Sequence, residues 1–128
     1  MKAIGYRAPF PINHPHSLLD LELPDPRPAS RDLLVRVKAI SVNPVDVKVR
    51  AGVAPPAGEP RILGWDAAGV VEEVGAEVSL FAPGDEVFYA GALNRPGTNS
   101  ELHLVDERLV GRKPRSVSFP QAAATVRS

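Results

Sequence analysis

The sequence contains no cysteine, and it has only one methionine and one tryptophan among 128 residues. A chain without cysteine forms no disulfide and no thiolate metal centre, so the four-cysteine type of zinc site is excluded. No apolar run is long enough to cross a bilayer, and the N-terminal residues lack the apolar core of a signal peptide. These absences lead us to expect a cytoplasmic protein that does not bind membranes.

Neither sign of charge is in excess. Fifteen Lys and Arg residues balance fifteen Asp and Glu residues, and no run of like charges occurs. Binding to nucleic acid or to an anionic membrane surface draws on a basic patch or a net positive charge. We therefore expect neither of these partners.

Proline and glycine, in contrast, are plentiful, with 14 and 10 residues. This composition is typical of a loop-rich β domain, and 128 residues suit one domain. Apolar residues alternate with polar ones, or form short runs bounded by turn residues, in segments that predict β-strands. These segments are 3–7, 18–23, 33–42, 67–71, 86–90, 100–105 and 108–113. Segment 33–42 is the clearest of them, and 67–71 is apolar enough to be buried on both faces.

Two short helices are also predicted. Asn43 and Pro44 form a good helix start over 43–52, although the alternating valines 45, 47 and 49 also fit a strand. Ser118 and Gln121 have the spacing of a capping box, with alanines following. The second helix would have to end within a few residues, at the end of the chain.

The histidines suggest no metal site. His14 and His16 flank a proline in a loop, and no cysteine or carboxylate cluster accompanies them. His103 lies in the predicted strand 100–105, where we expect a half-exposed side chain. We expect no catalytic role for any of the three.

Two glycine-containing motifs carry the strongest signal. The first is GWDAAGVV at 64–71, and the second is the turn PGDEV at 83–87. Glycines 64, 69 and 75 are expected to permit a positive φ, a bulge or a close approach of two backbones. In this order, the two motifs resemble the N-terminal domain of the medium-chain dehydrogenase/reductase superfamily. Within it, the chain is most similar to zinc-type alcohol dehydrogenase-like proteins and NADPH:quinone reductases.

The resemblance implies a mainly β, GroES-like, partly open barrel with a few short helices. It places this domain at residues 1–119. Residues 120–128 are expected to be the stump of a helix leading to a dinucleotide-binding domain, because the superfamily continues there. The sequence contains no Gly-x-Gly-x-x-Gly phosphate turn, no P-loop and no Gly-x-Ser-x-Gly elbow. We therefore expect a truncated chain, to which NADPH would not bind by itself.

The resemblance also implies that zinc is absent. Asn43 and Trp65 stand where the zinc enzymes of the superfamily have cysteine and histidine ligands. In the zinc-free quinone reductases, the asparagine at this place and its helix neighbours lie beside the nicotinamide. We therefore expect Asn43 and Lys48 to act in catalysis. Cofactor or substrate would contact a larger set: Asn43, Asp46, Lys48, Trp65, Asp66 and Tyr89.

Structural alternatives remain for three of these residues. Asn43 could serve only as a helix cap, Asp46 could pair only with the helix dipole, and Trp65 could pack in the core. Three functions compete for the whole chain. It could be the substrate-side domain of a zinc-independent NADPH-dependent reductase acting on a quinone or carbonyl compound. It could instead be a stand-alone binding or assembly module, or a non-functional gene fragment. Separately, we expect that the chain can form a homo-oligomer, because it would expose apolar surface where a further domain packs.

Overall fold

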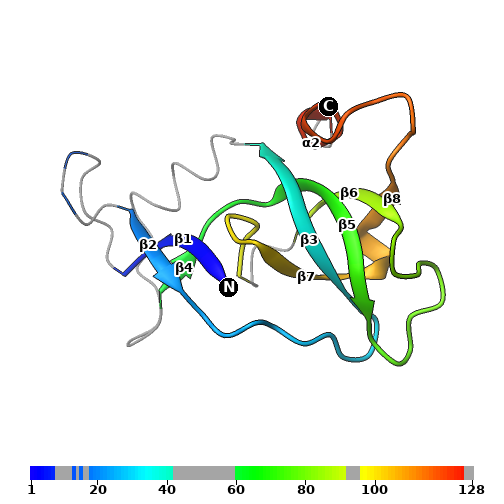
Figure 1. Ribbon diagram of the computed structural model, residues 1–128, viewed down its shortest axis with the longest axis horizontal. Coiled ribbons are helices and arrows are strands. Elements are labelled where there is room, and N and C mark those ends of the chain that lie inside the picture. Colours follow the sequence, from blue (N-terminus) through cyan, green and yellow to red (C-terminus); the bar gives the residue numbers. More distant parts are fainter. Residues whose placement is uncertain (8–12, 14, 16–17, 42–59, 92–95, 126–128) are drawn as a thin grey trace.

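The computed structural model describes residues 1–7, 13, 15, 18–41, 60–91 and 96–125. The predicted helix at 43–52 lies outside these residues. Within them the fold is built from two antiparallel sheets (Figure 1). The smaller sheet has the order β2-β1-β4, with bounds Leu19–Glu22, Lys2–Tyr6 and Arg61–Ile62. An isolated bridge pairs Ala3 of β1 with Ser100, two residues before β7 (Leu102–Asp106).

The larger sheet has the order β7-β3-β5-β6-β8, and Figure 1 shows its long strands β3 and β5 side by side. Its strands are Leu102–Asp106, Asp32–Ser41, Asp66–Val74, Glu86–Ala90 and Val110–Arg112. The two sheets do not close into a complete barrel over the described residues. The prediction of a mainly β, partly open architecture is therefore confirmed.

Most strand predictions are confirmed, but the predicted strands 100–105 and 108–113 are too long, and β7 begins only at Leu102. The strand β6 has the predicted bounds, and β5 is buried on both faces along its first half. The predicted strand 108–113 is shorter, because Glu107–Leu109 form the 3-10 turn η1 ahead of β8. The Asp106 carboxylate caps this turn by accepting from the Arg108 amide at 2.9 Å. The strand β4 was not predicted, since two residues carry no periodicity.

The main core lies on one face of the larger sheet. Its buried residues come from β3, β5, β6 and β7: Leu33, Val35, Ala67, Val71, Val87, Tyr89 and Val105. The helix α2 (Phe119–Thr125) covers a second apolar cluster, in which Ala122 and Ala123 pack against Ala68 (Figure 1). Small side chains at this contact let the helix approach the sheet closely.

The predicted capping box at the start of α2 is confirmed. The Ser118 hydroxyl accepts from the Gln121 amide at 3.3 Å, and the Gln121 side chain accepts from the Ser118 amide at 2.9 Å. The glycine predictions are confirmed as well. Gly64 has a φ of 97°, and side chains at Gly69 or Gly75 would collide with neighbouring backbone carbonyls.

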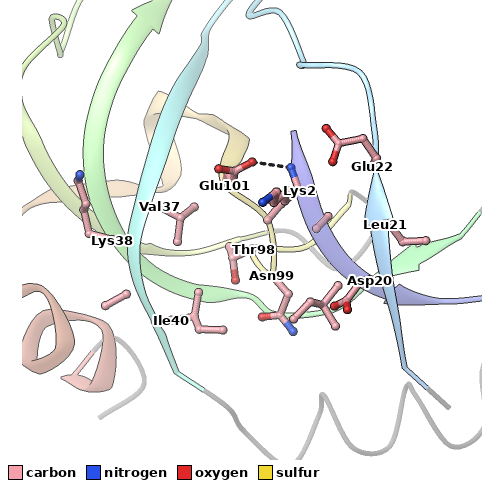
Figure 2. A pocket seen from close by; sticks show the side chains of 14 residues that line it. Lys2, Asp20, Leu21, Glu22, Val37, Lys38, Ile40, Thr98, Asn99 and Glu101 are labelled. Atoms are coloured by element: carbon pink, nitrogen blue, oxygen red, sulfur yellow. Dashed lines mark hydrogen bonds between the residues drawn. The ribbon is translucent and has the colours of Figure 1, made fainter. Parts of the chain in front are cut away.

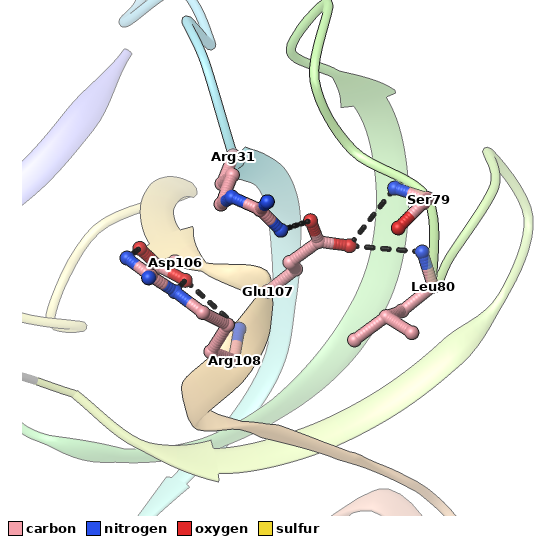
Figure 3. Close-up of polar contacts among 6 residues, drawn as sticks. All are labelled: Arg31, Ser79, Leu80, Asp106, Glu107 and Arg108. Atoms are coloured by element: carbon pink, nitrogen blue, oxygen red, sulfur yellow. Dashed lines mark hydrogen bonds and ion pairs between the residues drawn. The ribbon is translucent and has the colours of Figure 1, made fainter.

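A buried carboxylate ties three loops together at the end of the larger sheet (Figure 3). The Glu107 side chain is fully buried. Its Oε1 accepts from the amides of Ser79 and Leu80 at 3.0 and 2.9 Å. Its Oε2 lies 3.3 Å from Arg31 Nη1. No sequence pattern pointed to this residue.

Asp106 gives the fold a pH-dependent contribution. The Arg108 side chain, and then its backbone amide, hold the pKa of Asp106 well below its usual range. A lowered folded-state pKa means that Asp106 stabilises the fold above about pH 4 and that this stability is lost as the pH falls further. We expect Asp106→Asn to be less stable than the parent chain at pH 7. This difference should shrink below pH 4 in urea titrations, and a constant difference would contradict the assignment.

Candidate functional site

Three strand ends meet at one edge of the larger sheet. Ser41 at the end of β3 pairs with Asp66 at the start of β5, and Asp66 pairs with Ala90 at the end of β6. The chain therefore leaves β3 next to Asp66. The predicted residues Asn43, Asp46 and Lys48 follow shortly after Ser41 but lie outside the described residues. Their contact with this edge remains a prediction.

Residues 62–65, just before β5, form backbone hydrogen bonds with two parts of the chain that follows β6. The Trp65 carbonyl accepts from the Gly91 amide at 2.6 Å. The carbonyls of residues 62, 63 and 64 accept from the amides of residues 97, 99 and 98 at 2.8–2.9 Å. The chain after β6 is thus attached to 62–65 both where it leaves β6 and where it returns at 97–99.

Trp65 and Asp66 are both buried. Trp65 is 3% exposed and packs in a small core cluster with Tyr6 and Leu63. The Arg61 guanidinium lies 6.0 Å from its ring centroid. Asp66 is 1% exposed. The packing of Trp65 agrees with its interpretation as a core residue. Contact of Trp65 or Asp66 with a cofactor remains a prediction.

Tyr89 is also buried, and its polar partner is His103. The phenol oxygen lies 2.9 Å from His103 Nδ1, and the two rings stack with centroids 5.6 Å apart. Burial raises the pKa of the Tyr89 phenol far above its usual value, so the group stays protonated. His103 Nε2 lies 2.9 Å from the Pro96 carbonyl oxygen.

The expectation of a half-exposed His103 is wrong, since this residue is only 5% exposed. Alternation in the sequence assigned one face of the strand to solvent. In the structure Leu102, His103 and Val105 are all buried. Burial of the imidazole is possible because its hydrogen bonds to Tyr89 and Pro96 satisfy it inside the protein.

A groove of about 880 Å³ opens between the smaller sheet and β3 (Figure 2). Ile4 and Ile40 form part of its apolar lining and are 45% and 39% exposed. Lys2, whose amide bonds to Glu101, stands among the charged lining residues. The volume suits a small molecule. Of the predicted site residues that the structure describes, Trp65, Asp66 and Tyr89 do not line this groove.

Within the described ranges, no group of three or more His, Cys, Asp or Glu residues has the arrangement of a metal site. The same part of the chain contains no helix that is both long and apolar enough to cross a membrane.

Comparison with known proteins agrees with the motifs at 64–71 and 83–87. Residues 29–115 match the family described as alcohol dehydrogenase GroES-like domain. A zinc-type alcohol dehydrogenase-like protein of Staphylococcus epidermidis is 43% identical over 97% of this chain and 36% of its own length.

Solved structures show the same relationship. A provisionally assigned zinc-dependent alcohol dehydrogenase of Rhizobium etli is 60% identical, with a TM-score of 0.93 over 97% of this chain and 36% of that chain. The quinone oxidoreductase of Escherichia coli, solved in complex with NADPH, is 32% identical, with a TM-score of 0.82 over 98% of this chain and 37% of that chain.

This chain thus spans little more than a third of the length of these relatives. The fold, the motif order and the family match agree. The chain belongs to the alcohol dehydrogenase GroES-like domain family, within the medium-chain dehydrogenase/reductase superfamily.

Proposed function

We propose that this chain is the substrate-side domain of a zinc-independent, NADPH-dependent reductase that acts on quinones or related carbonyl compounds, in the cytoplasm. The observation that carries the proposal is the meeting of Ser41, Asp66 and Ala90 at one sheet edge, directly before the predicted Asn43 to Lys48 turn. The relative solved with NADPH is a quinone oxidoreductase, which supports the choice of cofactor and substrate class.

The zinc-free part of the proposal rests on residue chemistry. Zinc sites in proteins draw on cysteine, histidine and carboxylate ligands. Asn43 and Trp65 stand at the two positions where the resemblance implies cysteine and histidine, and the chain has no cysteine elsewhere. Trp65 is moreover packed in the core with Tyr6 and Leu63. The names of some relatives include zinc. Our proposal of a zinc-free reductase therefore differs from what those names alone would suggest.

The described residues do not fit the pyrophosphate of NADPH. Such a group binds the free amides at a helix N-terminus or a glycine-rich turn. At the start of α2 the Gln121 amide is already bonded to the Ser118 side chain, and no glycine-rich phosphate turn occurs in the sequence. We therefore propose that residues 120–128 connect residues 1–119 to a dinucleotide-binding domain, where NADPH would supply hydride.

The proposed task of this chain is to orient the substrate and to stabilise charge. Reduction of a quinone or enone builds negative charge on the substrate oxygen. A positive or hydrogen-bonding group held near that oxygen lowers the barrier, more so in a water-poor cleft than in bulk water. Lys48 would supply the charge, and the Asn43 amide would hold the substrate or nicotinamide in line. Asp46, Asp66, Trp65 and Tyr89 would shape the surrounding cleft.

The test uses a longer form, in which the chain continues into a dinucleotide-binding domain. We expect Lys48→Met to lower kcat about a hundredfold with a smaller change in KM, because the interaction forms mainly in the transition state. Asn43→Ala should also lower kcat, and should cost about 1 kcal/mol of stability through loss of the helix cap. The measurement is NADPH oxidation with a simple quinone.

His14→Gln and His16→Gln are the matched controls and should keep parental rates. The 128-residue chain should neither oxidise NADPH nor bind it with low-micromolar affinity in calorimetry. Purified protein should contain no stoichiometric zinc by elemental analysis. Parental turnover by both the Lys48 and Asn43 variants would show that these residues are structural, and stoichiometric zinc would refute the zinc-free mechanism.

A stand-alone binding module is the second candidate, and the groove between β1, β2 and β3 is the observation that favours it. Such a module would need no dinucleotide-binding domain and could act as a homo-oligomer. Size-exclusion chromatography with light scattering on the 128-residue chain distinguishes a defined oligomer from a monomer.

A further inference from the structure

We propose that His103 is a positioning residue. Held in one tautomer between Tyr89 and Pro96, it fixes Gly91 and residues 96–99 against residues 62–65. This contact lies at the strand edge that the proposed function assigns to the substrate. The effect of this contact on the substrate rests on the proposed function. The positioning itself follows from the contacts of the described residues.

The hydrogen-bond partners determine the tautomer of His103. The Pro96 carbonyl oxygen can only accept a hydrogen bond, so Nε2 at 2.9 Å must carry the proton. In the neutral ring Nδ1 is then an acceptor. The Tyr89 hydroxyl at 2.9 Å therefore donates to Nδ1. Each group has one role, and the three form a directed chain from phenol to imidazole to carbonyl.

Packing leaves this chain of hydrogen bonds little freedom. Tyr89 and His103 are 2% and 5% exposed, and their rings stack at an interplanar angle of 9°. Tyr89 is held by β6, where it pairs with Ala67 and Val110. His103 is held by β7, where it pairs with Val35. The imidazole thus links two strands that are not neighbours in the sheet order.

The same imidazole lies at the point where the chain is attached to 62–65. A Cβ atom built on Gly91 would lie 3.4 Å from His103 Cε1 and 3.5 Å from the Trp65 carbonyl oxygen. Pro96, which accepts from Nε2, directly precedes the Gly97 amide that bonds to Ile62. His103 therefore bonds to the chain directly before residues 97–99, and its ring borders the space beside Gly91, where the chain leaves β6.

The tautomer can be observed in the 128-residue chain. In ¹⁵N NMR spectra at neutral pH we expect His103 Nδ1 to have the shift of an unprotonated nitrogen and Nε2 that of a protonated one. Tyr89→Phe removes one oxygen and the donor to Nδ1. We expect this variant to keep the proton on Nε2, because Pro96 still accepts from it, and to shift the Nδ1 resonance, because Nδ1 has lost its donor. A protonated Nδ1 in the parental chain would overturn the proposal.

Two substitutions test separately the hydrogen bonds of His103 to Pro96 and to Tyr89. His103→Gln places an amide nitrogen near the Nε2 position, so it keeps a donor for Pro96. His103→Asn places an oxygen near the Nδ1 position, so it keeps an acceptor for Tyr89 and loses Pro96. We expect hydrogen exchange at the Gly97 amide to be about tenfold faster in His103→Asn, and near the parental rate in His103→Gln.

The Val71 amide of β5, which bonds to the Asp85 carbonyl just before β6, is separated from His103 by the strand β3 and serves as the reference, so its exchange should not change. Equal Gly97 exchange in all three proteins would refute the positioning role. If His103→Asn does not fold, the parental spectrum still decides the tautomer. In the longer form, His103→Asn should lower kcat about tenfold and His103→Gln should not. Equal kcat values, in an enzyme that does reduce quinones with NADPH, would limit the role to the fold. Absence of any such activity would refute the proposed function instead.

Discussion

Glu107→Ala is expected to lower the free energy of unfolding by about 3 kcal/mol, since each hydrogen bond to a charged group contributes about 1.5–3 kcal/mol. The substitution removes an oxygen that accepts from two backbone amides, those of Ser79 and Leu80. It also breaks the ion pair with Arg31, whose side chain is 46% exposed and can be solvated by water. The larger part of the loss therefore comes from the backbone amides.

Glu107→Gln is the matched control. Its amide oxygen can still accept from Ser79 and Leu80, while the attraction to Arg31 is lost. We expect a loss of about 1 kcal/mol or less for this partly exposed pair. Urea unfolding of the three proteins at pH 7 measures the difference. Equal losses for Ala and Gln would mean that the ion pair, and not the acceptance of backbone hydrogen bonds, makes Glu107 important.

Gly69→Ala is expected to destabilise the fold by about 3 kcal/mol, the upper part of the range for overpacked sites. A Cβ atom at Gly69 would lie 2.3 Å from the Arg36 carbonyl oxygen and 2.7 Å from Val35 Cγ1. The carbonyl belongs to the neighbouring strand β3, next to an irregularity in its pairing with β5. The new methyl group can be accommodated only if these two central strands move apart.

Gly91→Ala is the control for Gly69→Ala. The nearest atoms to a Cβ at Gly91 are 3.4 and 3.5 Å away, which is ordinary contact. We expect a change within about 1 kcal/mol, because loss of chain entropy in the unfolded state offsets small adjustments. Thermal unfolding followed by circular dichroism compares the two. A Gly69→Ala chain as stable as Gly91→Ala would show that the sheet can widen at low cost.

Several elements follow from local chemistry, and the sequence was sufficient to predict them. The alternation along 33–42 predicts β3, since side chains on a strand face opposite sides in turn, and the short apolar run after the turn at 83–87 predicts β6. Ser118 and Gln121 predict the start of α2 because each satisfies the amide of the other. The motifs at 64–71 and 83–87 indicated the family, which the match over residues 29–115 confirms.

The buried polar residues could not be predicted in this way. His103 and Glu107 are charged or polar residue types that sequence reasoning assigns to solvent. Their partners are far away in the chain: Arg31 is 76 residues from Glu107, and Tyr89 is 14 residues from His103. No local period records such pairings, and they become evident only when the strand register is known.

The sequence by itself determined the mainly β class, the strongest strands and turns, the helix cap and the family. These features depend on periodicity, turn residues and caps that act over a few neighbouring positions. Only the tertiary structure decided that His103 and Glu107 are buried, and that Ser41, Asp66 and Ala90 share one edge. The physical reason is that a polar group is stable inside a protein when distant segments bring it partners, and the sheet register determines which segments meet.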